Sequence, residues 1–167
     1  MKQTLVFLAL AAILLHYACT NPDTGTAALR SRVDSLERQL TKSYKPGFGE
    51  FMSGIQVHHA KLWFAGLNQN WRLADFEAQE IREALDAIQQ YEPDRPETRE
   101  IPTVYPALGR VEETIQAQDL PAFQAGFAQL TTACNACHQK VNYGFNQIKI
   151  PDQPPFSNQV FPPQSAR

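Results

Sequence analysis

Apolar residues recur at alternating intervals of four and three positions along much of the chain, which is the spacing of one face of an α-helix. Four segments carry such a stripe: Phe48, Met52, Ile55, His59, Leu62 and Gly66; then Ala74, Ile81, Leu85 and Ile88; then Val104, Leu108, Val111 and Ile115; and last Phe123, Phe127, Leu130, Cys134, Cys137 and Val141. No segment alternates as a strand does. The pattern therefore predicts an all-α protein, with an antiparallel four-helix bundle over residues 47–147.

Turn-forming residues indicate where these helices begin and end. Residues 68–70 break the first stripe, and the second helix is expected over about 71–91. Prolines in the polar segment 93–102 predict a loop before the third helix. Asp119 is a good N-cap for the fourth helix, and Pro121 suits its first turn.

An additional amphipathic segment precedes the bundle. Leu29, Val33, Leu36 and Leu40 have coiled-coil spacing, with charged residues between them, over less than three heptads. A stalk, an oligomerisation helix and an extra helix packed on the bundle all fit this pattern. We expect residues 19–46 to form a tether and this coiled-coil-like helix, with a homo-oligomer through residues 27–43 as one outcome.

The C-terminal segment, residues 148–167, is expected to be extended. Five prolines in the last 17 residues exclude a helix. Apolar residues nevertheless recur there, which favours a tail that lies along the bundle: Ile148, Ile150, Phe156, Val160 and Phe161.

The N-terminus has the pattern of an export signal. Lys2 precedes an apolar run from Leu5 to Leu15, which is too short to span a bilayer but is typical of a signal peptide. An uncleaved short anchor is the alternative. Cys19 follows the run and resembles the lipidated cysteine of bacterial lipoproteins, although His16 stands where that pattern has a small or apolar residue. We predict a signal peptide over 1–18 and a mature, lipid-modified Cys19.

Composition narrows the class of protein. Hydrophobic residues make up 43% and charged residues 19% of the chain, which is typical of a folded domain. Its 15 Lys and Arg against 17 Asp and Glu give a net charge of −2, which argues against a nucleic-acid partner. Three cysteines are too few for a disulfide scaffold.

The strongest chemical signal is the run from Cys134 to His138, which reads C-x-x-C-H. This is the attachment motif of c-type haem. On a helix these positions share one face, so both thiols can reach the haem vinyl groups while His138 is the proximal iron ligand. A redox dithiol, a partial zinc site and chance are the alternatives. A dithiol of the thioredoxin kind needs a βαβ context, and zinc needs about four ligands.

The late position of the motif, in the last helix of a predicted four-helix bundle, resembles class II cytochromes c, the cytochrome c prime group, or a neighbouring family of monohaem bundle cytochromes. The resemblance covers about residues 48–145. It implies one covalent haem c and a choice of distal sites, either an open apolar face that binds NO or CO, or a Met from the first helix. The His138-Gln139-Lys140 sequence lacks the aromatic and basic pair that often follows the motif in that family.

Two residues of the first helix are candidates for the sixth iron ligand. In an up-down bundle the first half of that helix lies beside the C-terminal half of the last helix, so Met52 and His59 both qualify. They are seven residues apart, about 10.5 Å along a helix, and cannot both reach the iron. Either could instead fill space in the core or, for His59, find a partner there or at a haem propionate. His58 lies at the edge of the same face, and Lys61 could pair with a propionate.

These observations predict an exported, lipid-anchored monohaem cytochrome that transfers one electron to a redox partner protein at a bacterial membrane, on its periplasmic side. A gas-binding haem protein is the alternative. A haem peroxidase would need distal acid and base residues, for which only His58 or His59 could be cited. We therefore expect an electron carrier with no enzymatic activity, and Trp63 and Trp71 as packing residues.

Overall fold

The computed structural model describes residues 24–44 and 46–164, and the predicted signal peptide and Cys19 lie outside this part of the chain. The described residues form α-helices and one 3-10 helix, with no strand, which confirms the all-α prediction. The chain divides between Tyr44 and Lys45 into two units. The first contains helix α2. The second, here called the helical unit, contains the other elements. In chain order, the elements of both units are α2 (Thr24–Lys42), α3 (Phe48–Leu67), α4 (Trp71–Tyr91), η1 (Pro96–Thr103), α5 (Tyr105–Ala117) and α6 (Leu120–Lys140).

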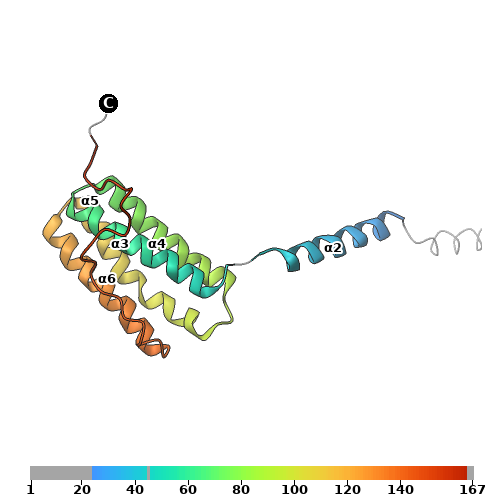
Figure 1. Cartoon of the computed structure of the whole chain (residues 1–167). Helices are drawn as coiled ribbons and strands as arrows, with labels where there is room; N and C mark the ends of the chain where they lie inside the picture. Colours follow the sequence, from blue (N-terminus) through green and yellow to red (C-terminus); the bar gives the residue numbers. More distant parts are fainter. Residues whose placement is uncertain (1–23, 45, 165–167) are drawn as a thin grey trace, which may run out of the picture. The chain divides into compact units, whose positions relative to one another are not determined.

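Within the helical unit, α3 packs on α4, α4 on α5, α5 on α6, and α6 back on α3 (Figure 1). Contacts between α3 and α6 run in opposite directions along the two helices, since His59 meets Thr131 and Trp63 meets Phe127. The apolar stripes predicted from the sequence supply most of the core. Fully buried side chains include Leu62, Ile88, Leu108, Val111, Phe123, Phe127 and Leu130.

Local capping explains where two of these helices begin. The Asn70 side chain accepts a hydrogen bond from the Leu73 amide at the start of α4. The Asp119 side chain accepts one from the Ala122 amide at the start of α6, as its N-cap role predicts. Between α5 and α6, Gln118 adopts the left-handed conformation with φ of 55°, which allows the tight turn between them.

The loop predicted over residues 93–102 is instead partly helical. Residues Pro96–Thr103 form the 3-10 helix η1, and Ile101 within it is buried. Proline is tolerated at the start of a helix, because its missing N–H has no partner there in any case. The tight 3-10 geometry then directs Ile101 into the core, which the polar sequence does not reveal.

The C-terminal segment runs back along the helical unit without helix or strand (red in Figure 1). Two attachments hold it. Asn135 on α6 binds the Ile148 backbone, and Asn70 donates a hydrogen bond to the Phe161 carbonyl oxygen at 3.0 Å. Phe161 is buried against Phe64. The tail thus lies along the helical unit, as the sequence suggests, with Phe161 buried and with Ile150, Phe156 and Val160 exposed.

Helix α2 begins at Thr24, three residues before the expected 27–43 segment. Its four stripe residues are all at least half exposed, with exposed fractions of 62% for Leu29, 50% for Val33, 58% for Leu36 and 67% for Leu40.

Candidate functional site

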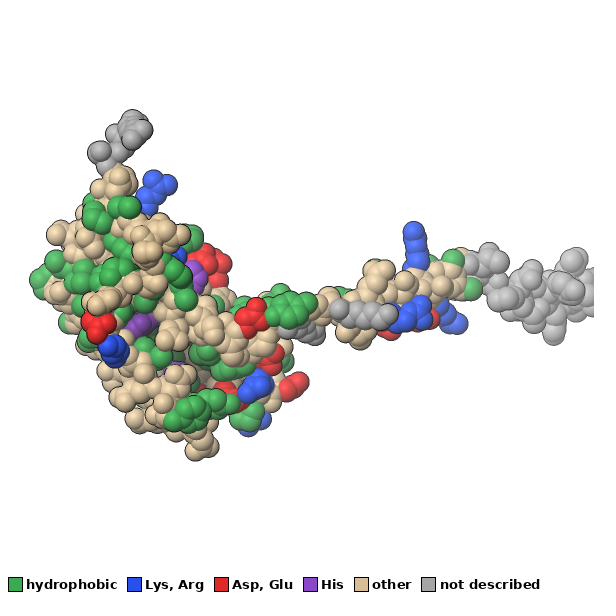
Figure 2. All heavy atoms as spheres, in the orientation of Figure 1, with side chains coloured by type: hydrophobic (Ala, Val, Ile, Leu, Met, Phe, Trp, Pro, Cys, Tyr) green, Lys and Arg blue, Asp and Glu red, His purple; other side chains and the backbone are tan. Residues whose placement is uncertain are grey.

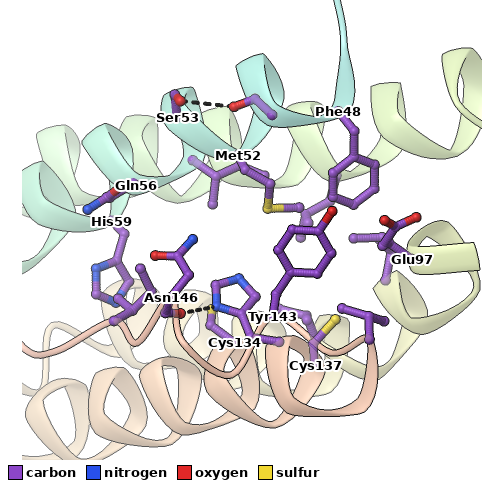
Figure 3. Close-up of a pocket in the computed structure, with 18 of the residues that line it drawn as sticks. Phe48, Met52, Ser53, Gln56, His59, Glu97, Cys134, Cys137, Tyr143 and Asn146 are labelled. Carbon is purple, nitrogen blue, oxygen red and sulfur yellow. Dashed lines mark hydrogen bonds between the residues drawn. The ribbon is translucent and has the colours of Figure 1, made fainter. Parts of the chain in front are cut away.

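A cavity of about 240 Å³ opens between α3 and the C-terminal end of α6 (Figure 3). Apolar residues line most of it, from α3, α4, η1 and α6, and the segment that follows α6 closes one side. The residues central to its chemistry are Met52 and His59 on α3, and Cys134, Cys137 and His138 on α6. The structure thus brings the motif residues and both candidate sixth ligands to one cavity.

Both motif cysteines are free thiols on the cavity wall, Cys137 buried and Cys134 half-buried. Burial, and to a smaller extent the charge of the neighbouring Cys137, raises the pKa of Cys134 to about 11. Burial also raises the pKa of Cys137, and Glu100 adds to this effect. A reactive redox dithiol requires a lowered thiol pKa, so this environment argues against the dithiol alternative.

The ring of His138 is oriented by the segment that follows α6. Its Nδ1–H donates a hydrogen bond to the carbonyl oxygen of Asn146, with a nitrogen–oxygen distance of 2.6 Å (Figure 3). A carbonyl oxygen can only accept, so the proton must lie on Nδ1. In the neutral ring this leaves the lone pair on Nε2. Such a second partner is the usual means by which a protein fixes the tautomer and direction of a ligating histidine.

Asn135, inside the motif, holds this segment in place. Its side-chain amide donates to the Ile148 carbonyl oxygen at 2.8 Å, and its side-chain oxygen accepts from the Ile148 amide at 2.8 Å. These paired bonds fix the chain two residues after Asn146. Sequence reasoning missed both asparagines, because neither belongs to the motif's chemistry and a backbone carbonyl partner has no sequence signature.

His59 is buried and has a protein partner for one ring nitrogen. Its Nε2 lies 2.9 Å from the Thr131 hydroxyl, which donates its own proton to the Phe127 carbonyl oxygen at 3.0 Å. Nε2 must therefore carry a proton and donate it to Thr131. Burial lowers the pKa of His59 to about 4, so the ring is neutral at pH 7. The sequence left open whether His59 finds a partner in the core, and Thr131 is such a partner for Nε2.

Met52 also lines the cavity. Figure 3 shows it on α3, facing the cysteines of α6 across the cavity. It is half-buried, and its thioether sulfur is at most a weak hydrogen-bond acceptor. The Met52 sulfur therefore needs no hydrogen-bond partner, whereas Nε2 of His59 donates to Thr131.

The other residues named from the sequence lie away from the cavity or have other partners. His58 Nδ1 lies 2.7 Å from Glu77 Oε2, and Lys61 Nζ lies 3.0 Å from Glu77 Oε1. Glu77 is fully buried, and a buried carboxylate requires such partners. Lys61 is thus engaged with Glu77. Trp63 and Trp71 pack against Phe123, as expected for packing residues.

Charged and aromatic side chains form the rim of the cavity. Arg95 Nη2 lies 2.8 Å from Glu97 Oε1, and its guanidinium stands over the Phe48 ring at 5.3 Å. The hydrogen bond from Arg95 lowers the pKa of Glu97. Tyr143 lines the cavity and is 40% exposed, so it lies at the solvent side. None of these four residues was named as a site residue from the sequence.

Fold and site together define an all-α protein with a C-x-x-C-H motif on the wall of an apolar cavity between helices. Among the described residues, no three or more His, Cys, Asp or Glu side chains converge as they would around a bare metal ion, and no helix has the length and apolarity to cross a membrane. The chain matches no protein-family model, no curated protein and no solved structure.

Proposed function

We propose that this chain is an exported, lipid-anchored monohaem c-type cytochrome that transfers one electron at a time. One observation carries the proposal: Cys134, Cys137 and His138 line the same cavity, and the hydrogen bond from His138 Nδ1 to Asn146 leaves Nε2 for an iron ligand. When bound, haem would supply the redox centre that accepts and releases the electron.

The donor set fits a haem c. Two neutral thiols on one helix face would form the thioether links, and a neutral imidazole is a good proximal ligand. The ring of contacts from α3 to α6 and back supports the antiparallel four-helix bundle of the class II cytochromes c, to which the chain would be related. Arg95 is the basic side chain of the rim, and a propionate would compete with Glu97 for it.

For the sixth iron ligand we favour Met52. His59 Nε2 donates to Thr131, so iron binding through that nitrogen would break a buried hydrogen bond. The Met52 sulfur has no such bond to lose. A Met and His ligand pair raises the reduction potential and suits electron transfer rather than gas binding.

The cavity of about 240 Å³ reaches solvent at its rim, where Tyr143 is 40% exposed. One edge of a bound haem would be accessible from this side. An exposed edge is where a redox partner would accept or donate the electron. The lipid anchor at Cys19 would keep the protein at the periplasmic side of a membrane and raise the effective concentration of membrane-bound partners.

Covalent attachment tests this proposal directly. The full chain, produced in a host that matures c-type cytochromes, should carry the mass of one haem that organic extraction does not remove. Cys134→Ala and Cys137→Ala should each leave a single thioether link, and the double variant should lose covalent haem. Thr132→Ala, on the exposed side of the same helix, is the matched control. Full-length, folded protein without haem would contradict the proposal.

A further inference from the structure

The apolar stripe of α2 plays no part in the proposed haem site. Its heptad pattern indicates the kind of partner that it binds. In heptad notation Leu29 and Leu36 occupy d positions, and Val33 and Leu40 occupy a positions. All four side chains are at least half exposed in the single chain. Contiguous exposed apolar side chains of this kind mark an interaction surface.

The residues of the exposed stripe favour a coiled coil of two helices. A β-branched residue at a together with leucine at d is typical of parallel dimers, and Val33 is flanked by Leu29 and Leu36. The stripe is also restricted to a and d positions, which is the narrow seam of a coiled coil rather than the broader face that a helix buries in a globular core.

Two charged side chains beside the seam are complementary between copies. Arg32 occupies a g position and Glu37 the following e position. In a parallel pair, the g residue of one helix faces the e residue five positions later in the other, so Arg32 would face Glu37 of the second copy, and the reverse. Within the part of the chain that the structure describes, neither side chain forms an ion pair.

We propose that α2 binds a second copy of this chain as a parallel, in-register coiled coil, with its seam at Leu29, Val33, Leu36 and Leu40 and with two symmetric pairs between Arg32 and Glu37. In an antiparallel pair g positions face g positions, so Arg32 would not meet Glu37 and the charge match would be lost. The inference does not depend on haem.

A membrane surface fits α2 less well. Interfacial helices carry a broad apolar face, commonly with Trp or Phe, whereas α2 has no aromatic residue and acidic Asp34 and Glu37 among its charges. Figure 2 shows basic side chains projecting from two sides of α2 rather than from one polar face.

Sedimentation equilibrium of the full chain, with or without haem, in detergent matched in density to the solvent, tests the dimer. We expect a concentration-dependent equilibrium between one and two chains. Leu36→Asp should weaken it at least about 100-fold, because it places a charge in the seam. The haem spectrum and the unfolding temperature of the helical unit should not change.

Charge exchange tests the parallel register. Arg32→Glu and Glu37→Arg should each weaken the dimer about tenfold, because each makes both pairs repulsive. The double variant should recover the affinity, and the two single variants mixed together should pair with one another. Arg38→Glu, at the outward f position, changes the charge equally and should have no effect.

Several outcomes would overturn the proposal. A trimer would exclude the dimer. A double variant that dimerises no more tightly than the single variants would exclude the parallel register. A chain that stays monomeric at all concentrations would assign the stripe elsewhere: to its own helical unit if Leu36→Asp lowers the unfolding temperature, or to lipid if the variant loses binding to anionic vesicles.

Discussion

The α3–α6 interface is tightly packed at one end and holds a cavity at the other. At one end, Trp63, Phe123 and Phe127 lie within 6.2 Å of one another, centroid to centroid, and Gly66 allows the Phe123 ring to touch the α3 backbone. At the other end, the same stripes carry Met52, Cys134 and Cys137 around a cavity.

This difference indicates that the cavity is not a result of loose packing. At the packed end Phe123 and Phe127 are 0% exposed, so the helices can approach closely where the sequence provides large apolar groups. The open end has medium-sized sulfur-containing side chains and a hydrogen-bonded histidine at the same interface. The sequence thus fills one end of the interface with its own side chains and leaves a cavity at the other.

The largest effect is expected at the packed end. Phe123→Ala should lower the free energy of unfolding by about 3–5 kcal/mol, because it leaves a void among three aromatic rings. Tyr143→Ala, at the exposed rim of the open end, should cost under about 1 kcal/mol. Chemical denaturation of the purified chain and of each variant measures both losses. Equal losses in the free energy of unfolding would contradict the difference in packing between the two ends.

His59 makes the interface between the two ends sensitive to pH. Its folded pKa of about 4 lies below the usual 6.5, so the unfolded chain binds more protons between these values. The contribution of neutral His59 to the free energy of unfolding is therefore fully present above pH 6.5. It is lost as the pH falls toward 4, which lowers the free energy of unfolding by on the order of 3 kcal/mol.

His59→Gln keeps a donor for Thr131 but does not titrate, so it should lose this part of the pH dependence. Urea denaturation of both proteins at pH 7 and pH 4.5 gives the comparison, and carboxylates that titrate in both cancel. If the variant and the parent lose equal stability over this range, His59 is not buried as described.

Gly66 is required by the packed end. A Cβ there would stand 2.1 Å from the Phe123 ring, so Gly66→Ala should destabilise the fold by about 1–3 kcal/mol. Gly54, on the same helix, has nothing within 4 Å of its Cβ position, so Gly54→Ala should stabilise by about 0.5–1 kcal/mol. Thermal unfolding of the two variants checks the opposite signs.

At the open end, Asn135→Ala should cost about 1–2 kcal/mol, since it removes two hydrogen bonds that hold the segment after α6. Thr132→Ala, an exposed control on the same helix, should cost less. Faster amide hydrogen exchange at Ile148 in the Asn135 variant would show the released segment, and unchanged exchange would exclude this role.

The sequence predicted the helices better than their polar partners. Stripes of apolar residues and the Asp119 cap depend on neighbours in the chain, so periodicity reveals them. The partners of His59 and His138 are Thr131 and the Asn146 carbonyl, which only the packing brings close. Buried Glu77 was unexpected for the same reason, because its hydrophilic side chain is stabilised there by His58 and Lys61 from another helix.

The absorption spectrum of the full chain, produced in a host that matures c-type cytochromes, then reduced and mixed with carbon monoxide, tests the central claim most directly. With His138 and Met52 as the two ligands, we expect a low-spin reduced spectrum that carbon monoxide does not change. Met52→Ala should become high-spin and bind carbon monoxide, whereas His59→Gln should not. A high-spin parent that binds carbon monoxide at once would contradict the ligand assignment and favour a gas-binding protein, and the absence of any haem spectrum would contradict the whole account.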